Sequence, residues 1–241
     1  MAVSTAPGTP APQRVRRSTA GRVWSSTVGK KAVMAVSGAI LFLYVVAHMV
    51  GNLKAFAGAG ALDDYGVFLR EFLSPVLGYG GFLWVVRVVL LLAVVLHMVA
   101  AVQLARRARK ARPVSYARRP RVQGSYAART MRWGGVIIAL FVVYHLLDLT
   151  AGVLNPNGVE GAIHANVVAD FQRWYVVLAY TLAVVALGFH LRHGLFSALR
   201  SLGVASARRA AAVRGTALGV AVVITVGFLV VPFGVLFGIV R

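Results

Sequence analysis

Apolar residues along this chain gather into five long stretches separated by polar segments. The stretches cover approximately residues 32–52, 82–105, 133–153, 173–198 and 215–240. About 20 residues of helix are needed to cross a hydrocarbon core that is roughly 30 Å thick. Backbone groups find no water partners inside a membrane, so each stretch is predicted to be a membrane-spanning α-helix.

Composition agrees with this prediction. The 241 residues are 59% hydrophobic and only 13% charged, and the chain contains no cysteine. Such values are typical of an integral membrane protein. The sequence therefore predicts an all-α membrane protein, with residues 32–241 as its transmembrane domain and residues 1–31, rich in Ala, Pro, Ser, Thr and Arg, as a disordered basic tail. Without cysteine, the chain cannot ligate an iron–sulfur cluster or attach a c-type haem.

Positive charge is distributed very unevenly between the stretches. Of the 26 Lys and Arg residues, six lie before the first span, ten between Arg106 and Arg132, and five between Arg192 and Arg214. These segments, including the N-terminus, are predicted to be cytoplasmic. The net charge of +20 therefore reflects topology and lipid or partner contact, not nucleic acid binding. The six acids are expected in the outer loops or near the outer end of span three: Asp63, Asp64, Glu71, Asp148, Glu160 and Asp170.

One histidine lies in each of the first four spans, at nearly equal intervals. The intervals are 97−48 = 49, 145−97 = 48 and 190−145 = 45 residues. An imidazole in hydrocarbon is costly unless it is paired or ligated, so such residues usually mark function. The four matched positions, His48, His97, His145 and His190, point to a metal or haem.

An internal repeat predicts how these histidines pair. Aligning Gly38–His48 with Gly135–His145 makes spans one and two resemble spans three and four. Each repeat holds two spans, so both run in the same direction and are related by an axis along the membrane normal. Depth along the helices then predicts an outer pair, His48 with His145, and an inner pair, His97 with His190.

Two haems, each bridging the two repeats, satisfy this arrangement within a four-helix bundle. A zinc or copper site would instead need its ligands to converge on one point. Small residues at Ser37-Gly38 and Gly134-Gly135 lie at the depth of the inner pair. They either make room for a macrocycle or allow close helix packing.

Three further polar residues, Arg87, His193 and His164, also need an interpretation. Arg87 lies about five residues into span two, where a haem propionate or Asp148 could neutralise it, or where it snorkels to the surface. His193 lies three residues after His190 and is a rival ligand or a propionate partner. His164 is predicted to be a solvated loop residue.

The ordered set of four motifs resembles the five-helix, single-chain dihaem cytochrome b anchors, of the b558 type, of succinate dehydrogenases and fumarate reductases. The resemblance covers essentially residues 30–240. The matching motifs are Ser37-Gly38 before His48 with Gly51-Asn52-Leu53 after it, His97 before Gln103-Leu104, and Phe189-His190 before Gly194.

This resemblance implies a subunit of respiratory complex II, an enzyme of the tricarboxylic acid cycle, in a bacterial inner membrane. The chain would bind two b haems through His48, His97, His145 and His190, but would not itself act on succinate. It would carry electrons between menaquinone and an iron–sulfur subunit, which in turn binds a flavoprotein with covalent FAD. Assembly of the complex into a higher oligomer is left open.

Quinone chemistry also requires protons, and the acids of the chain gather on its outer side. Glu71, Asp64 and Tyr65 in the first outer loop are therefore the predicted proton-handling residues, and Glu71 is most like the acid that precedes the second helix in the family. The alternative is that they solvate a loop and balance Lys54 and Arg70.

Two other classes of membrane protein remain open from the sequence. One is the dihaem cytochrome b anchor of a formate dehydrogenase or hydrogenase, in which the ligands are distributed differently over the helices. The other is a haem-free transporter with a parallel repeat, in which the histidines would relay protons.

Overall fold

The structure is a computed structural model that describes residues 24–111, 126–156, 158–203 and 208–241, together with Ser18, Gly21 and Ser206. From 126 to 129 it describes only the backbone. The predicted tail, residues 1–31, therefore lies largely outside the described residues. The predicted membrane domain, residues 32–241, is described apart from the gaps between the ranges given above.

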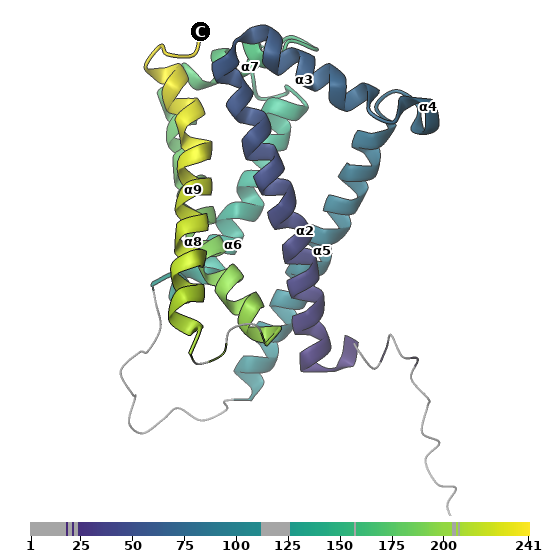
Figure 1. Cartoon of the computed structure of the whole chain (residues 1–241), viewed down its shortest axis with the longest axis vertical. Helices are drawn as coiled ribbons and strands as arrows, with labels where there is room; N and C mark the ends of the chain where they lie inside the picture. The colour runs from purple at the N-terminus through teal and green to yellow at the C-terminus, as the bar shows by residue number, and fades with distance from the viewer. Residues whose placement is uncertain are drawn as a thin grey trace, which may run out of the picture.

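Five helices within the described ranges are long and apolar enough to cross a membrane, which confirms the predicted all-α membrane class. They run alternately up and down along the long axis of the molecule (Figure 1). The third continues beyond its α-helical part into a π-helical turn, η2 (Leu146–Thr150). The five are α2 (Thr27–Asn52), α5 (Gly81–Lys110), α6 (Tyr126–His145), α8 (Trp174–Ser201) and α9 (Ala210–Leu236).

Several of these helices begin or end beyond the apolar stretch that predicted them, on the side that carries the Lys and Arg residues. The first helix starts at Thr27, where the Ser26 hydroxyl accepts a hydrogen bond of 2.8 Å from the Gly29 N–H and caps it. Residues 27–31 are thus helical, which corrects the predicted tail boundary at residue 31. At the same end of the molecule, α5 continues to Lys110. We call this end, formed by the start of α2 and the end of α5, the basic end.

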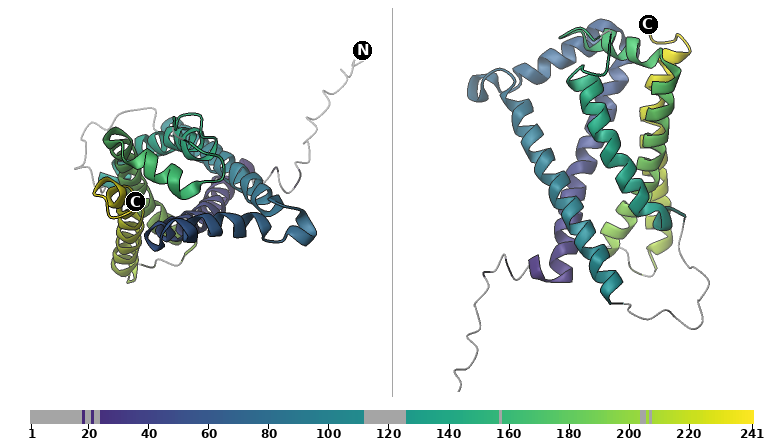
Figure 2. Two further views of the ribbon diagram at one scale, coloured as in Figure 1. Left: turned by 90° about the horizontal axis from the view of Figure 1, so that it is seen from above. Right: turned by 180° about the vertical axis from the view of Figure 1, so that it is seen from behind.

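Short helices close the opposite end of the molecule, which we call the acidic end. Along the chain they are η1 (Leu53–Ala57), α3 (Ala59–Glu71), α4 (Ser74–Leu77) and α7 (Ile163–Phe171). Helix α3 packs across α7, and Gly66 lets it approach because a Cβ atom there would collide with the Ile163 side chain. Figure 2 shows α3 and α7 lying across the ends of the long helices.

The long helices pack as two hairpins joined by the fifth helix. Helix α2 packs against α5, α6 packs against α8, and α9 contacts both α8 and α2. Glycines permit these contacts, since a Cβ at Gly188 of α8 would meet Thr225 of α9 and one at Gly227 of α9 would meet Met49 of α2. The fifth helix therefore holds the two halves of the repeat together.

Candidate cofactor-binding site

The four matched histidines lie in the two pairs that their spacing predicts. The ring centroids of His48 and His145 are 5.8 Å apart, and those of His97 and His190 are 6.2 Å apart. The first pair lies toward the acidic end and the second toward the basic end. Because ten residues of helix separate the depths of the two pairs along α2, they lie about 15 Å apart. Within the described residues, no group of three or more His, Asp or Glu side chains could hold one metal ion.

Two glycines bring the inner histidines close to the neighbouring helix. A Cβ at Gly38 of α2 would lie 3.2 Å from His97 Cε1, and one at Gly135 of α6 would lie 3.8 Å from His190 Cε1. The same glycine-to-histidine contact thus occurs in both hairpins, as expected for a parallel repeat. At Gly38 the absent side chain leaves room for an imidazole ring.

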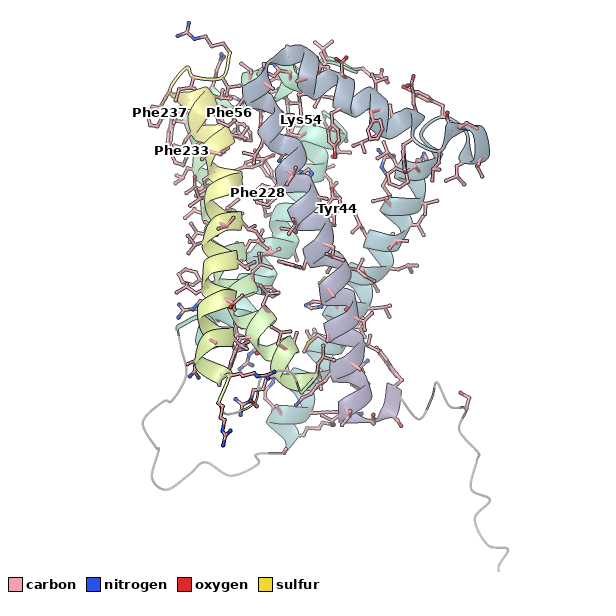
Figure 3. The ribbon with its side chains drawn as sticks, in the orientation of Figure 1. Tyr44, Lys54, Phe56, Phe228, Phe233 and Phe237 are labelled. Atoms are coloured by element: carbon pink, nitrogen blue, oxygen red, sulfur yellow. The ribbon has the colours of Figure 1, made fainter. Side chains whose placement is uncertain are left out.

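The outer histidines also share one local arrangement. Tyr44 stacks on His48 with ring centroids 5.4 Å apart, and Phe141 stacks on His145 at 5.9 Å. Each aromatic residue precedes its histidine by four positions, which places both side chains on one helix face. Phe228 also reaches from α9 toward α2 and lies 5.9 Å from the His48 ring (Figure 3).

Hydrogen bonds decide which ring nitrogen of two histidines is free. The Nδ1 atom of His97 lies 3.0 Å from the Met34 carbonyl oxygen, which can only accept, so Nδ1 carries the proton. The Nδ1 atom of His145 lies 3.1 Å from the Tyr180 hydroxyl, which donates its own proton to Asp148. Tyr180 therefore accepts from His145. In both rings the lone pair is on Nε2, the arrangement of a metal-bound histidine backed by a hydrogen bond.

The inner pair borders a hollow with apolar walls. A cavity of about 290 Å³ between α6 and α8 is lined by Gly134, Ala186, Phe189 and His190, among others. Within the described chain, His190 Nδ1 is buried and has no hydrogen-bond partner. Such an orphaned polar atom beside a hollow fits a site that receives a group from outside the chain.

The spacing of both pairs fits two imidazoles on opposite faces of one iron. With a metal–nitrogen bond of about 2 Å on each side, the two ring centroids lie about 6 Å apart. The observed separations of 5.8 and 6.2 Å are close to this value. The side chains present thus fit a haem at each pair, although the role of the histidines as ligands stays a prediction.

Comparison with known protein families gives one match. Residues 106–232 match the succinate dehydrogenase/fumarate reductase transmembrane subunit family, which is 232−105 = 127 of the 241 residues. The chain belongs to this family. The matched region runs from the end of α5 into α9 and includes His145 and His190. No curated protein and no solved structure matches the chain.

Because the chain belongs to this family, it is a membrane anchor subunit of the succinate dehydrogenase/fumarate reductase complex. Membership favours that class over the anchors of formate dehydrogenases and hydrogenases and over a haem-free transporter. The matched residues do not include His48 and His97. The prediction of two haems therefore depends on the geometry of the pairs.

One of the alternatives for Arg87 in the transmembrane subunit, pairing with Asp148, does not occur in the structure. Arg87 does not contact Asp148, which is 1% exposed and is bonded to Tyr180, with Arg173 3.9 Å away. Asp148 lies in the π-helical turn η2 and bonds to Tyr180 of α8. The Arg87 guanidinium lies over the Trp84 ring at 4.9 Å, and the salt bridges of the described residues do not include it. A haem propionate as its partner and snorkelling to the surface stay the two predicted alternatives.

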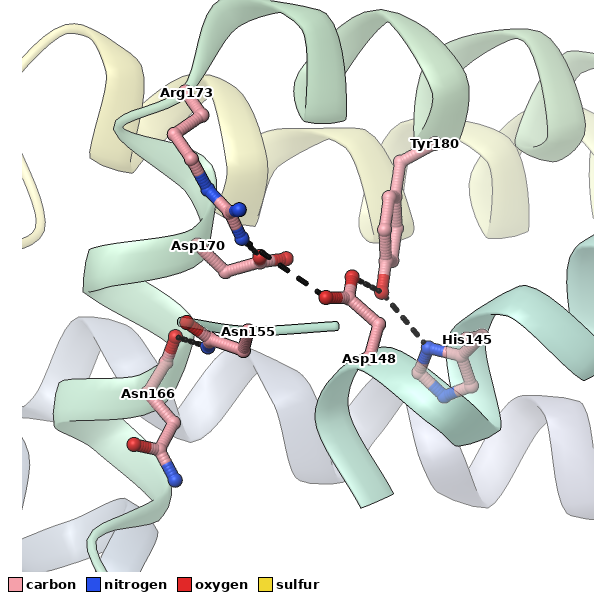
Figure 4. Close-up of polar contacts among 7 residues, drawn as sticks. All are labelled: His145, Asp148, Asn155, Asn166, Asp170, Arg173 and Tyr180. Atoms are coloured by element: carbon pink, nitrogen blue, oxygen red, sulfur yellow. Dashed lines mark hydrogen bonds and ion pairs between the residues drawn. The ribbon is translucent and has the colours of Figure 1, made fainter. Parts of the chain in front are cut away.

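Three polar residues near the outer pair were missed by sequence reasoning, namely Tyr180, Asp170 and Arg173. Arg173 forms an ion pair with Asp170, which is fully buried (Figure 4). A signal for Tyr180 was present in the repeat. It precedes His190 by ten residues, just as Arg87 precedes His97 by ten.

The remaining two histidines of the subunit take different places. His164 is 4% exposed, so its prediction as a solvated loop residue is wrong. Its backbone N–H donates to Asp63 at 2.9 Å and ties α7 to α3, an interaction between outer loops that spacing could not reveal. His193 bonds Ser197 on its own helix at 3.1 Å, whereas the ring next to His97 belongs to His190.

The predicted proton-handling residues lie on α3 at the acidic end. Asp64 and Glu71 are exposed. Tyr65 packs against Gly51 of α2, and the Lys54 ammonium lies over its ring at 5.4 Å. Among the described residues no ion pair joins Glu71 to Lys54 or Arg70, so the charge-balancing alternative has no contact to support it.

Proposed function

We propose that this membrane anchor passes electrons between a soluble iron–sulfur subunit and menaquinone through two b haems. The observation that carries the proposal is the arrangement of four histidines as two facing pairs at different depths, with ring centroids 5.8 and 6.2 Å apart, so that each pair would hold one haem. Haem iron supplies one-electron transfer when it is bound by such a pair.

Residues of both hairpins would hold each group. His48 of α2 and His145 of α6 face each other at the outer position, and His97 of α5 and His190 of α8 do so at the inner one. Nε2 is the ligating atom of His97 and His145, because the Nδ1 atom of each is bonded elsewhere. Arg87 is free of carboxylate partners in the described chain and would bind a propionate.

The basic end is the proposed docking side for the iron–sulfur subunit. Positive residues concentrate in segments that face the cytoplasm, and the basic end is where these segments meet. Its helices are tied together by Arg107, which donates to the Ser25 carbonyl oxygen at 2.8 Å, and by Lys30, which donates to Gln103. These contacts fix α2 against α5 beside the inner pair.

The acidic end is the proposed side of quinone reaction. Reduction of a quinone consumes two electrons and two protons, so it requires titratable groups with access to water near the outer pair. Asp64 and Glu71 on α3 are exposed, and Tyr65 of the same helix contacts α2 one turn beyond His48. These residues can exchange protons with water without crossing hydrocarbon.

Affinity purification of the tagged chain from its native membrane tests the proposal. We expect the iron–sulfur and flavin subunits to copurify, and succinate to reduce b-type absorption bands in the complex. Dithionite serves as the control that reduces all haem present. Copurification of the soluble subunits with a chain that has no b-type absorption would contradict the electron-transfer role and leave only anchoring.

A further inference from the structure

The two outer histidines have different supports. His145 Nδ1 is 3.1 Å from the Tyr180 hydroxyl, which donates to Asp148 at 3.2 Å. The position equivalent to Tyr180 in the first hairpin is Arg87, a residue that has only donor groups and cannot accept from a histidine. The repeat is therefore asymmetric at the outer pair: His145 is backed by Tyr180 and Asp148 (Figure 4), whereas the described residues give His48 no such hydrogen bond.

The fold fixes the Tyr180 hydroxyl in place. Tyr180 is 7% exposed, and its ring packs edge-on against Phe141 and Phe171, each with centroids 4.8 Å away. These contacts join Tyr180 of α8 to two other helices, α6 and α7. The hydroxyl therefore has little freedom to turn away from His145.

The α-helical part of α6 ends at His145, the residue that Tyr180 contacts. The Ala151 N–H donates to the Leu146 carbonyl oxygen at 2.7 Å, an i+5 bond that closes the π-helical turn η2 directly after His145. Turns of this kind are frequent at functional sites because they redirect a side chain. Here the turn carries Asp148, which lies buried against α8.

The carboxylate of Asp148 is held by a cation. A buried carboxylate without a partner is unfavourable. Arg173 lies 3.9 Å from one Asp148 oxygen, and it also forms an ion pair with Asp170. The other Asp148 oxygen is thereby left to accept the Tyr180 proton.

We propose that Tyr180, held by Asp148, is a positioning residue that orients His145 and lowers the reduction potential of the haem at the outer pair. This inference rests on the proposed function, since it takes His145 as a ligand. A hydrogen bond from Nδ1–H to an acceptor makes the ring a more basic ligand and fixes its orientation. A more basic ligand stabilises ferric over ferrous iron.

Redox titration of the purified complex tests this inference. Tyr180→Phe removes only the hydroxyl. The reduction potential of the outer haem should then rise by about 59 mV, which is a tenfold change in the equilibrium between ferric and ferrous iron for a one-electron couple. The inner haem should be unchanged. Asp148→Asn should shift the same haem in the same direction, because the amide weakens the acceptor that holds the tyrosine proton.

Thr181→Val is the matched control. It removes a hydroxyl from the next position of α8, where Thr181 Oγ1 bonds only to the Val177 carbonyl oxygen. Its potentials should equal those of the wild type. Loss of the outer haem from Tyr180→Phe alone would also support the inference, because His145 would then depend on the hydroxyl for its orientation.

An unchanged outer potential in Tyr180→Phe, or the same shift in Thr181→Val, would overturn the inference. Loss of the outer haem from both Tyr180→Phe and Thr181→Val would overturn the inference as well. Each of these results presupposes a wild-type complex that contains two haems. A wild-type complex without them would instead overturn the proposed function, so the two failures are distinguishable.

Discussion

His190→Ala should lose the haem at the inner pair and retain the one at the outer pair. His97→Ala should give the same result, since the two rings lie 6.2 Å apart and would together hold the inner haem. The haem content per chain is then expected to fall by about half, and assembly with the iron–sulfur subunit should be impaired if that subunit docks beside the inner pair as proposed. Pyridine haemochrome quantification and reduced-minus-oxidised spectra measure both haems.

His193→Ala provides the matched control on the same helix. His193 bonds Ser197 one turn away and makes no ring contact with His97, so both haems should remain. Retention of both haems in His190→Ala together with loss of one in His193→Ala would reverse the ligand assignment.

Glu71→Gln should slow quinone-linked turnover about a hundredfold, the lower range for loss of a positioned proton donor or acceptor. Haem content should be unaffected, since Glu71 is exposed on α3 and lies outside both histidine pairs. Succinate oxidation by a soluble dye should also be unaffected, because the dye takes electrons before they reach the membrane. Steady-state assays with a menaquinone analogue and with the dye measure the two activities separately.

Glu160→Gln is the corresponding control in the other outer loop. Glu160 is likewise exposed, but it does not lie on α3. Normal quinone activity in Glu71→Gln would show that this acid only solvates the loop. Equal losses in both variants would indicate a general effect of outer charge.

The sequence predicted the five spans and the histidine pairs because both depend on regular helix geometry. A rise of 1.5 Å per residue converts sequence position directly into depth, and the repeat supplies the facing partner. The first and second spans were predicted shorter than α2 and α5 because they were located by hydropathy. Their basic extensions are helical but not apolar, so hydropathy does not detect them.

Departures from regular helix were beyond the reach of the sequence pattern. The π-helical turn after His145 carries Asp148, whose carboxylate accepts a hydrogen bond from Tyr180 of α8. The burial of His164 depends on the packing of α7 against α3, two segments about a hundred residues apart. By contrast, Tyr180 could have been found, since its offset from His190 equals that of Arg87 from His97.

The haem-to-chain ratio of the purified wild-type complex shows directly whether each of the two histidine pairs binds one b haem. Pyridine haemochrome absorption gives the amount of haem b, and quantitative amino-acid analysis of the separated subunit gives the amount of this chain. Two haems per chain are expected, and a ratio of one or none would contradict the assignment of one haem to each pair.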